Sequence, residues 1–157
     1  MTEYEKLLDH AEKNNITVIE NYPLESKRLK GLYCDGVVAL GKNMETDAEK
    51  ACILAEELGH HYTAVGDIVL QSSAANRRQE MRGRIHAYDR LVGLHGILSA
   101  YHHHCQSFSE TAEYLNVTED FLRDAISHYK GKYGAYTTVD NYVILFEPAV
   151  AVLELTK

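Results

Sequence analysis

The stretch EKACILAEELGHHYT, residues 49–63, predicts the helix around which the rest of the chain is organised. Apolar residues recur along it at intervals of three and four, the spacing of a helix with one buried face: Ala51, Leu54, Ala55, Leu58 and Tyr62. Thr46 stands three residues before Glu49, as in a capping box, and predicts that the helix begins at residue 46 or 47. Two adjacent glutamates and two adjacent histidines therefore belong to a single helix.

The polar residues of this helix have the spacing of a metal site. Glu56 and His60 are four residues apart, so their side chains lie on one face of the helix. In the zinc-protease motif H-E-x-x-H, two histidines have this spacing and the glutamate after the first is the general base. Here Glu56 occupies the position of the first histidine, and Glu57 occupies that of the base. From these residues alone, an ordinary solvated helix face is the alternative to a metal site.

The exchange of histidine for glutamate affects which ion would bind. A carboxylate is an accepted zinc ligand, and in place of a neutral imidazole it lowers the net charge of the site by one. Because oxygen ligands suit harder ions, Mn²⁺ or Fe²⁺ become more competitive with Zn²⁺.

Gly59 is a further feature of the same helix. It directly precedes His60, although a glycine inside a helix costs roughly 1 kcal/mol relative to alanine. We therefore expect another segment of the chain to pack closely against the helix at this residue.

Composition limits the class of protein. The chain has 157 residues, of which 45% are hydrophobic and 25% charged, as expected for one globular domain with a sizeable core. No apolar run approaches the ~20 residues of a membrane span, and the polar N-terminus does not resemble a signal peptide, so we expect a cytoplasmic protein. A formal net charge of −7 argues against direct nucleic-acid binding.

The other elements predict an α+β fold that is mainly helical. Helices are expected over residues 3–14, 76–91, 94–103, 107–115 and 118–129. A strand over 16–22 and a hairpin over 31–40, turning at Asp35-Gly36, predict a small N-terminal antiparallel sheet. A C-terminal strand pair is expected over 134–147. We expect one domain over 1–157, divided into 1–45 (first helix and sheet), 46–104 (site helices) and 105–157 (helical hairpin and strands).

Three quoted segments extend the motif into a family resemblance. The chain resembles the ImmA/IrrE family of gluzincin-like metallopeptidases in three segments and in their order. These are ACILAEELGHHYT (51–63), RRQEMRGRIHAYDRL (77–91) and ETAEYLNVTEDFL (110–122). The chain resembles most the short members of phages and mobile elements, over nearly its whole length. The resemblance implies a zincin-like fold and a cytoplasmic, bacterial or phage-encoded enzyme.

The resemblance also implies a set of site residues. A glutamate of the following helix supplies the third metal ligand, and EMRGRIHA makes that residue Glu80. The implied ligands are then Glu56, His60 and Glu80 for one divalent metal, Zn²⁺ first and Mn²⁺ or Fe²⁺ as alternatives. Glu57 would be the catalytic base acting on metal-bound water.

Two histidines are auxiliary candidates. His61 lies about 100° around the helix from His60, so both cannot easily face one ion. On a face shared with Glu57, it would stabilise the charge of the transition state or bind substrate; the alternative is a histidine at the rim of the site, which we favour. His86 stands where the family usually has a large aromatic residue, and we expect it to pack as a core residue more than to hydrogen-bond near the site.

Metallopeptidases of this design hold their substrate as an added strand along the edge of a sheet. Residues 36–40, GVVAL, are the expected edge, with Val37, Val38 and Ala39 as the substrate strand. The implied function is a metal-dependent endopeptidase that hydrolyses a peptide bond in a regulatory protein such as a phage-type repressor. The alternative is a weakly active or inactive protein of the same fold that binds a repressor or regulator without cleaving it.

Two other motifs do not lead to a site. Three adjacent histidines at 102–104 point in different directions on a helix, so we expect a solvated helix end there. The segment 107–129 has the cadence of a helix-turn-helix, but its second helix begins with Glu119 and Asp120, which have the wrong charge to face phosphates. We expect this helical hairpin to complete the fold or to dock a protein.

Overall fold

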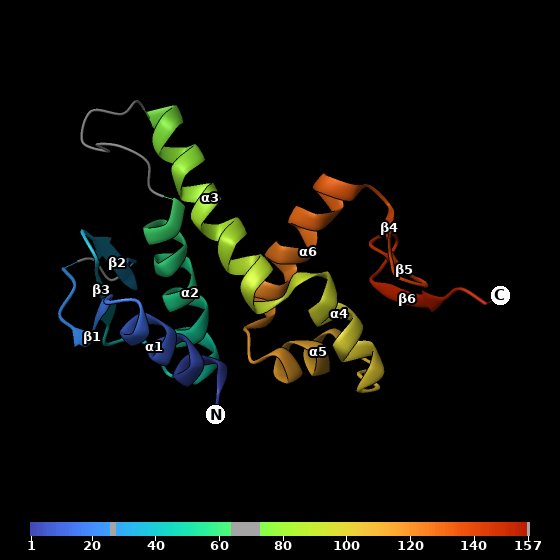
Figure 1. The fold of residues 1–157 in the computed structure, drawn as a ribbon, viewed down its shortest axis with the longest axis horizontal. Coiled ribbons are helices and arrows are strands. Elements are labelled where there is room, and N and C mark those ends of the chain that lie inside the picture. The colour runs from blue at the N-terminus through green and yellow to red at the C-terminus, as the bar shows by residue number, and fades with distance from the viewer. Residues whose placement is uncertain (26–27, 64–72, 157) are drawn as a thin grey trace. The chain divides into compact units, whose positions relative to one another are not determined.

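The computed structural model describes residues 1–25, 28–63 and 73–156, and the described residues confirm a mixed α+β fold (Figure 1). The chain forms two compact units, Met1–Arg90 and Leu91–Lys157. The boundary between the units falls within the segment 46–104 that the sequence analysis assigned to the site helices. Both helices of the candidate site belong to the first unit almost entirely.

The first unit contains a helix, a small sheet and two longer helices. Its elements are α1 (Glu3–Lys13), β1 (Thr17–Tyr22), β2 (Gly31–Cys34), β3 (Val37–Gly41), α2 (Asp47–Thr63) and α3 (Ser73–Leu91). The Thr46 hydroxyl accepts a hydrogen bond from the Glu49 N–H at 3.1 Å, which confirms the expected cap and the start of α2. Helix α2 packs against α1, β2 and β3. Its apolar stripe supplies much of the core, including the fully buried Leu54 and Leu58.

The N-terminal sheet is mixed, whereas the sequence analysis predicted an antiparallel one. The strand order is β1-β3-β2, with β3 antiparallel to β2 and parallel to β1. Asp35 and Gly36 form the β2–β3 turn with φ of 45° and 80°, as expected for the Asp-Gly hairpin signal. The hairpin leaves one edge of β3 free for β1, and β1 pairs there in the same direction as β3.

The second unit contains three helices and a sheet. Its elements are α4 (Gly93–His102), α5 (Phe108–Leu115), α6 (Glu119–Tyr133), β4 (Tyr136–Val139), β5 (Tyr142–Leu145) and β6 (Ala151–Glu154). Asn116 ends α5 in the left-handed conformation, and the Thr118 hydroxyl caps α6. Helix α4 ends at His102, as expected for the histidine run.

The C-terminal sheet has three strands where the sequence predicted a pair. Strand β6 adds to β5 in antiparallel register, with Leu145 opposite Ala151 and Tyr142 opposite Glu154. The strand is four residues long and follows Pro148, so it lacks the long alternating pattern that marks a strand in a sequence.

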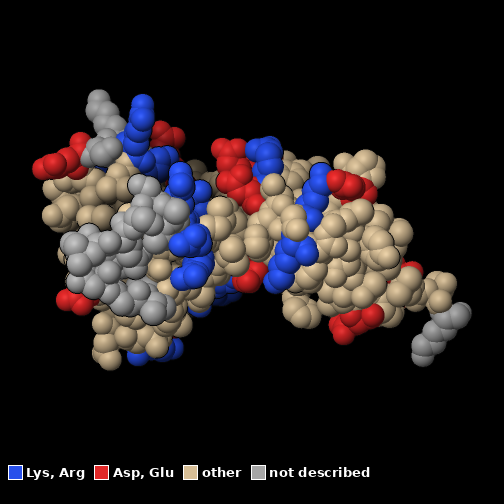
Figure 2. Space-filling view, turned by 90° about the horizontal axis from the view of Figure 1, so that it is seen from above, with Lys and Arg blue, Asp and Glu red and all other residues tan. Residues whose placement is uncertain are grey.

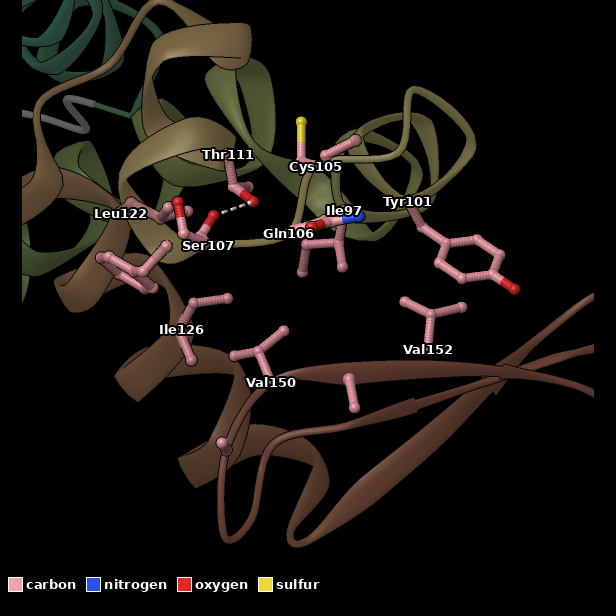
Figure 3. A pocket seen from close by; sticks show the side chains of 14 residues that line it. Ile97, Tyr101, Cys105, Gln106, Ser107, Thr111, Leu122, Ile126, Val150 and Val152 are labelled. Carbon is pink, nitrogen blue, oxygen red and sulfur yellow. Dashed lines mark hydrogen bonds between the residues drawn. The ribbon is translucent and has the colours of Figure 1, made fainter.

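Helices of this unit and the β6 segment enclose a mainly apolar cavity of about 270 Å³ (Figure 3). Ile97 and Tyr101 of α4 lie on one side, and Val150 and Val152 on the other. The Thr111 hydroxyl at the cavity wall donates a hydrogen bond to the Ser107 carbonyl at 3.0 Å. None of the helices in the described part of the chain has the length and apolar character needed to cross a membrane.

Candidate functional site

A pocket of about 350 Å³ in the first unit contains three of the residues that the sequence predicted for the site: Glu57, His60 and Glu80. We call it the site pocket. It is lined by Glu57 and His60 of α2, by Asn76, Gln79 and Glu80 of α3, and by Leu29, Gly31, Leu32 and Tyr33 in and before β2. Two helices and one strand therefore converge on the same space.

Two glycines let the helices of the site pocket approach each other closely. A Cβ atom on Gly59 would lie 2.3 Å from the Gly83 carbonyl oxygen, and one on Gly83 would lie 2.4 Å from His60 Nδ1. Both distances are too short for any larger residue. The close packing that Gly59 predicted is thus confirmed, and the second segment is α3. The imidazole of His60 lies over Gly83, beside an acidic residue that stands three positions before Gly83 on α3.

That residue is Glu80, and it forms an ion pair with His60. His60 Nε2 lies 3.1 Å from Glu80 Oε2. The hydrogen bond to Glu80 raises the pKa of His60, and the same bond lowers the pKa of Glu80. Arg84 Nε lies 3.7 Å from the other carboxylate oxygen and further favours the charged form of Glu80. Each partner therefore stabilises the charge of the other.

Arginines surround Glu80 on the exposed side of α3. All four have exposed side chains: Arg77, Arg78, Arg82 and Arg84. Of these four, Arg84 is the ion-pair partner of Glu80 among the described contacts. Figure 2 shows both basic and acidic side chains on the face that it presents.

Glu57 lies against the backbone of β2. A Cβ atom on Gly31 would lie 3.1 Å from Glu57 Cγ and 3.2 Å from its Oε1. Burial raises the pKa of Glu57 to about 7, against the lowering effect of His60 and with smaller raising effects of Glu80 and Glu56. Near neutral pH this carboxyl group can therefore both accept and release a proton.

His60 and Glu80 have a spacing that suits a metal ion. Two ligands of a tetrahedral ion with bonds of about 2.1 Å lie roughly 3.4 Å apart. The distance of 3.1 Å between His60 Nε2 and Glu80 Oε2 is close to this value. An imidazole nitrogen and a carboxylate oxygen are also a donor set that zinc, manganese and iron accept.

Glu56, the third expected ligand, is not among the described residues that line the site pocket. It is half-buried, and its negative charge raises the pKa of both His60 and Glu57. Across residues 1–25, 28–63 and 73–156, no three His, Cys, Asp or Glu side chains come together in a way that would hold an ion. Glu57 is the α2 carboxylate that shares the pocket with His60 and Glu80.

The expected substrate strand is wrong. Val37, Val38 and Ala39 belong to β3, which is the central strand and pairs with β1 on one side and β2 on the other. Because its backbone groups are used on both sides, β3 cannot accept a further strand. Within the described part of the chain, β2 is the edge strand at the site pocket, and it contributes Gly31, Leu32 and Tyr33 to the lining.

The two auxiliary histidines lie outside the site pocket. His61 Nδ1 is hydrogen-bonded to the Tyr33 hydroxyl at 2.7 Å, and the same hydroxyl accepts a hydrogen bond from the Gly36 N–H. His61 thus holds a residue of the pocket wall in place. The ring of His86 stacks on Tyr62 with centroids 5.4 Å apart, which agrees with the expected packing role. Burial and then Arg90 lower the pKa of His86.

Gln79, Asn76 and the β2 residues of the site pocket were not identified from the sequence. Gln79 had one usable signal, because it lies one helical turn before Gly83 and directly before Glu80. A residue at that position faces the close contact between the two helices. The residues 64–72, which join α2 to α3, lie outside the described part of the chain.

Comparisons with known proteins do not assign a family. No family model matches the chain, and no curated protein or solved structure matches it either. The interpretation of the site therefore depends on its geometry and on the motifs of the sequence.

Proposed function

We propose that the chain is a metal-dependent endopeptidase with zinc as its first-choice ion, or manganese or iron in its place. Its substrate would be a regulatory protein such as a phage-type repressor, and it would act in the cytoplasm of a bacterium. The observation that carries the proposal is the site pocket, where Glu57, His60 and Glu80 lie beside a free sheet edge. The ImmA/IrrE-like order of motifs supports the same reaction.

Strand β2 would hold the substrate. One side of β2 pairs with β3, and among the described residues no strand pairs with its other side, where an extended peptide would add. Its residues Gly31 to Tyr33 line the site pocket, so a peptide bound there would pass in front of Glu57. Gly31 has no side chain, which lets Glu57 lie directly against the strand.

His60 and Glu80 would hold the ion, since their donor atoms already have a suitable separation. When bound, such an ion lowers the pKa of water and polarises a carbonyl group. Glu57 would accept a proton from the attacking water and return it to the leaving amine. Its pKa of about 7 suits both transfers at neutral pH.

A cleavage assay tests this proposal. Zinc-loaded protein is incubated with a phage-type repressor and with an unfolded bacterial protein extract, and new peptide termini are identified by mass spectrometry. We expect termini that disappear with a chelator and with Glu57→Gln, while the Glu113→Gln control on α5 retains them. Glu113 is exposed and far along the chain from the site residues. Its substitution therefore makes the same change in charge as Glu57→Gln without altering the site. Termini that persist in Glu57→Gln, or none with wild type, would refute the proposal.

The position of Glu56 favours a second function, a peptide-binding protein that does not cleave. Within the described part of the chain, only two of the three expected ligands share the site pocket, and these two neutralise each other as an ion pair. This alternative predicts a stable complex with an intact repressor and little bound metal. A cut repressor together with a full complement of metal would exclude it.

A further inference from the structure

Gln79 is the most unusual polar residue of the site pocket. Its side chain is only 8% exposed, and it is a buried polar residue among the otherwise apolar core positions. Its Nε2 atom has no hydrogen-bond partner within the described part of the chain. A buried donor without a partner is costly, so such a group calls for an explanation.

The position of Gln79 directs it to the space that a ligand would fill. It lies four residues before Gly83 on α3, on the face that packs against α2. It also lines the site pocket together with Glu57, His60 and Glu80. The unpartnered amide is therefore buried at the wall of a cavity of about 350 Å³ rather than in a closed core.

The chemistry of the pocket indicates what the amide would bind. Glu57 and Glu80 are carboxyl groups, and His60 is already paired with Glu80 at 3.1 Å. Gln79 therefore supplies an amide N–H donor, which none of these three groups offers. A carboxamide carries both a donor and an acceptor, which matches the N–H and C=O of a peptide main chain.

We infer that Gln79 binds the main chain of a peptide in the site pocket, donating a hydrogen bond from Nε2 to a peptide carbonyl oxygen. The inference rests on the proposed function only in that the pocket takes a peptide, and it does not require cleavage. It makes Gln79 a substrate-positioning residue, whose buried donor is left unsatisfied in the free protein and becomes satisfied on binding.

This role predicts opposite effects of one substitution. Gln79→Met keeps the length of the side chain and removes the polar atoms. It should raise the Tm of the free protein by a few degrees, because a buried unsatisfied donor is lost. It should also weaken peptide binding roughly three- to tenfold, the value of one hydrogen bond. Gln106→Met, at an exposed glutamine, is the matched control and should change neither quantity.

The experiment uses the whole metal-free chain labelled with ¹⁵N. The probe is acetyl-trialanine amide, titrated at millimolar concentration, and the Gln79 side-chain amide resonance is assigned by its absence in Gln79→Met. We expect this resonance to shift with the backbone amides of Gly31 and Tyr33, and the Kd to rise in Gln79→Met. Shifts at β2 without a shift at Gln79, or an unchanged Kd, would overturn the inference.

Two further results separate this inference from the proposed function. A shift of Gln79 in a protein that neither binds metal nor cleaves supports the role of Gln79 and refutes the endopeptidase. A Tm that falls in Gln79→Met but not in Gln106→Met means that the amide has a structural partner, and it overturns the inference. If no resonance of the site pocket responds to the probe, the inference and its premise both fail.

Discussion

The close approach of α2 and α3 predicts a large effect of one methyl group. In Gly59→Ala the new Cβ would lie 2.3 Å from the Gly83 carbonyl oxygen. It would also lie 3.0 Å from the carbonyl carbon and 3.1 Å from the Cα of Gly83. Backbone atoms cannot rotate away, so the helices must separate by roughly 1 Å along their contact. Overpacking of this kind costs about 3 kcal/mol or more, and the better helix propensity of alanine returns about 1 kcal/mol. We expect a net destabilisation of about 2 kcal/mol.

Urea unfolding followed by circular dichroism measures this loss, on metal-free protein at neutral pH. Gly131→Ala is the matched control, because Gly131 lies in α6 and has no neighbouring atom within 4 Å of its Cβ position. This control should gain about 1 kcal/mol from helix propensity alone. A Gly59→Ala protein as stable as wild type would refute the contact between the two helices, and with it the placement of His60 over Gly83.

Three further changes test the electrostatics and hydrogen bonds around the site pocket. Because the folded-state pKa of Glu57 is raised to about 7, the stability of the metal-free protein should fall as pH rises from about 4.5 through 7. Glu57→Gln should remove this fall, and urea titrations at pH 8 should find the variant more stable than wild type by up to about 3 kcal/mol. A difference in stability between variant and wild type that does not change with pH would contradict the burial of the carboxyl group. In Glu80→Gln the pKa of His60 should drop, since the partner that raises it is lost, and an unchanged NMR titration of His60 would argue against the ion pair. Tyr33→Phe removes the hydroxyl that is hydrogen-bonded to His61 and should cost about 1 kcal/mol of stability in the same urea assay. An unaltered unfolding midpoint would speak against that hydrogen bond.

The local features of the fold follow from the sequence because short-range chemistry determines them. The turn at Asp35 and Gly36 requires positive φ at both residues, and Asp-Gly is among the pairs that adopt it most readily. Thr46 marks the start of α2 through a hydrogen bond to the backbone three residues later. Gly59 indicates a close contact because glycine is otherwise unfavourable inside a helix. Each of these signals can be recognised from a residue and its neighbours along the chain.

The order of the strands does not follow from the sequence. The apolar run of β3 predicts buried side chains, and Val38, Ala39 and Leu40 are indeed buried, but such a run does not tell whether a strand lies at the edge or at the centre of a sheet. The pairing of β1 with β3 depends on packing between segments far apart in sequence. The substrate strand was therefore assigned to β3 when β2 is the free edge.

The choice between the two adjacent glutamates also depends on tertiary structure. With 3.6 residues per turn, His60 lies between them on the helix surface, about 40° from Glu56 and about 60° from Glu57. The motif alone cannot tell which of the two shares a pocket with His60. The position of α3 and β2 decides it, because Glu80 and Gly31 both lie on the Glu57 side.

The central claim is that His60 and Glu80 hold a metal ion, and metal content tests it most directly. Wild type and His60→Ala are purified without chelators or nickel columns, incubated with zinc, desalted and analysed by plasma mass spectrometry. We expect about one zinc ion per chain in wild type and almost none in His60→Ala. Wild type without metal, or a His60→Ala variant that retains as much as wild type, would contradict the claim.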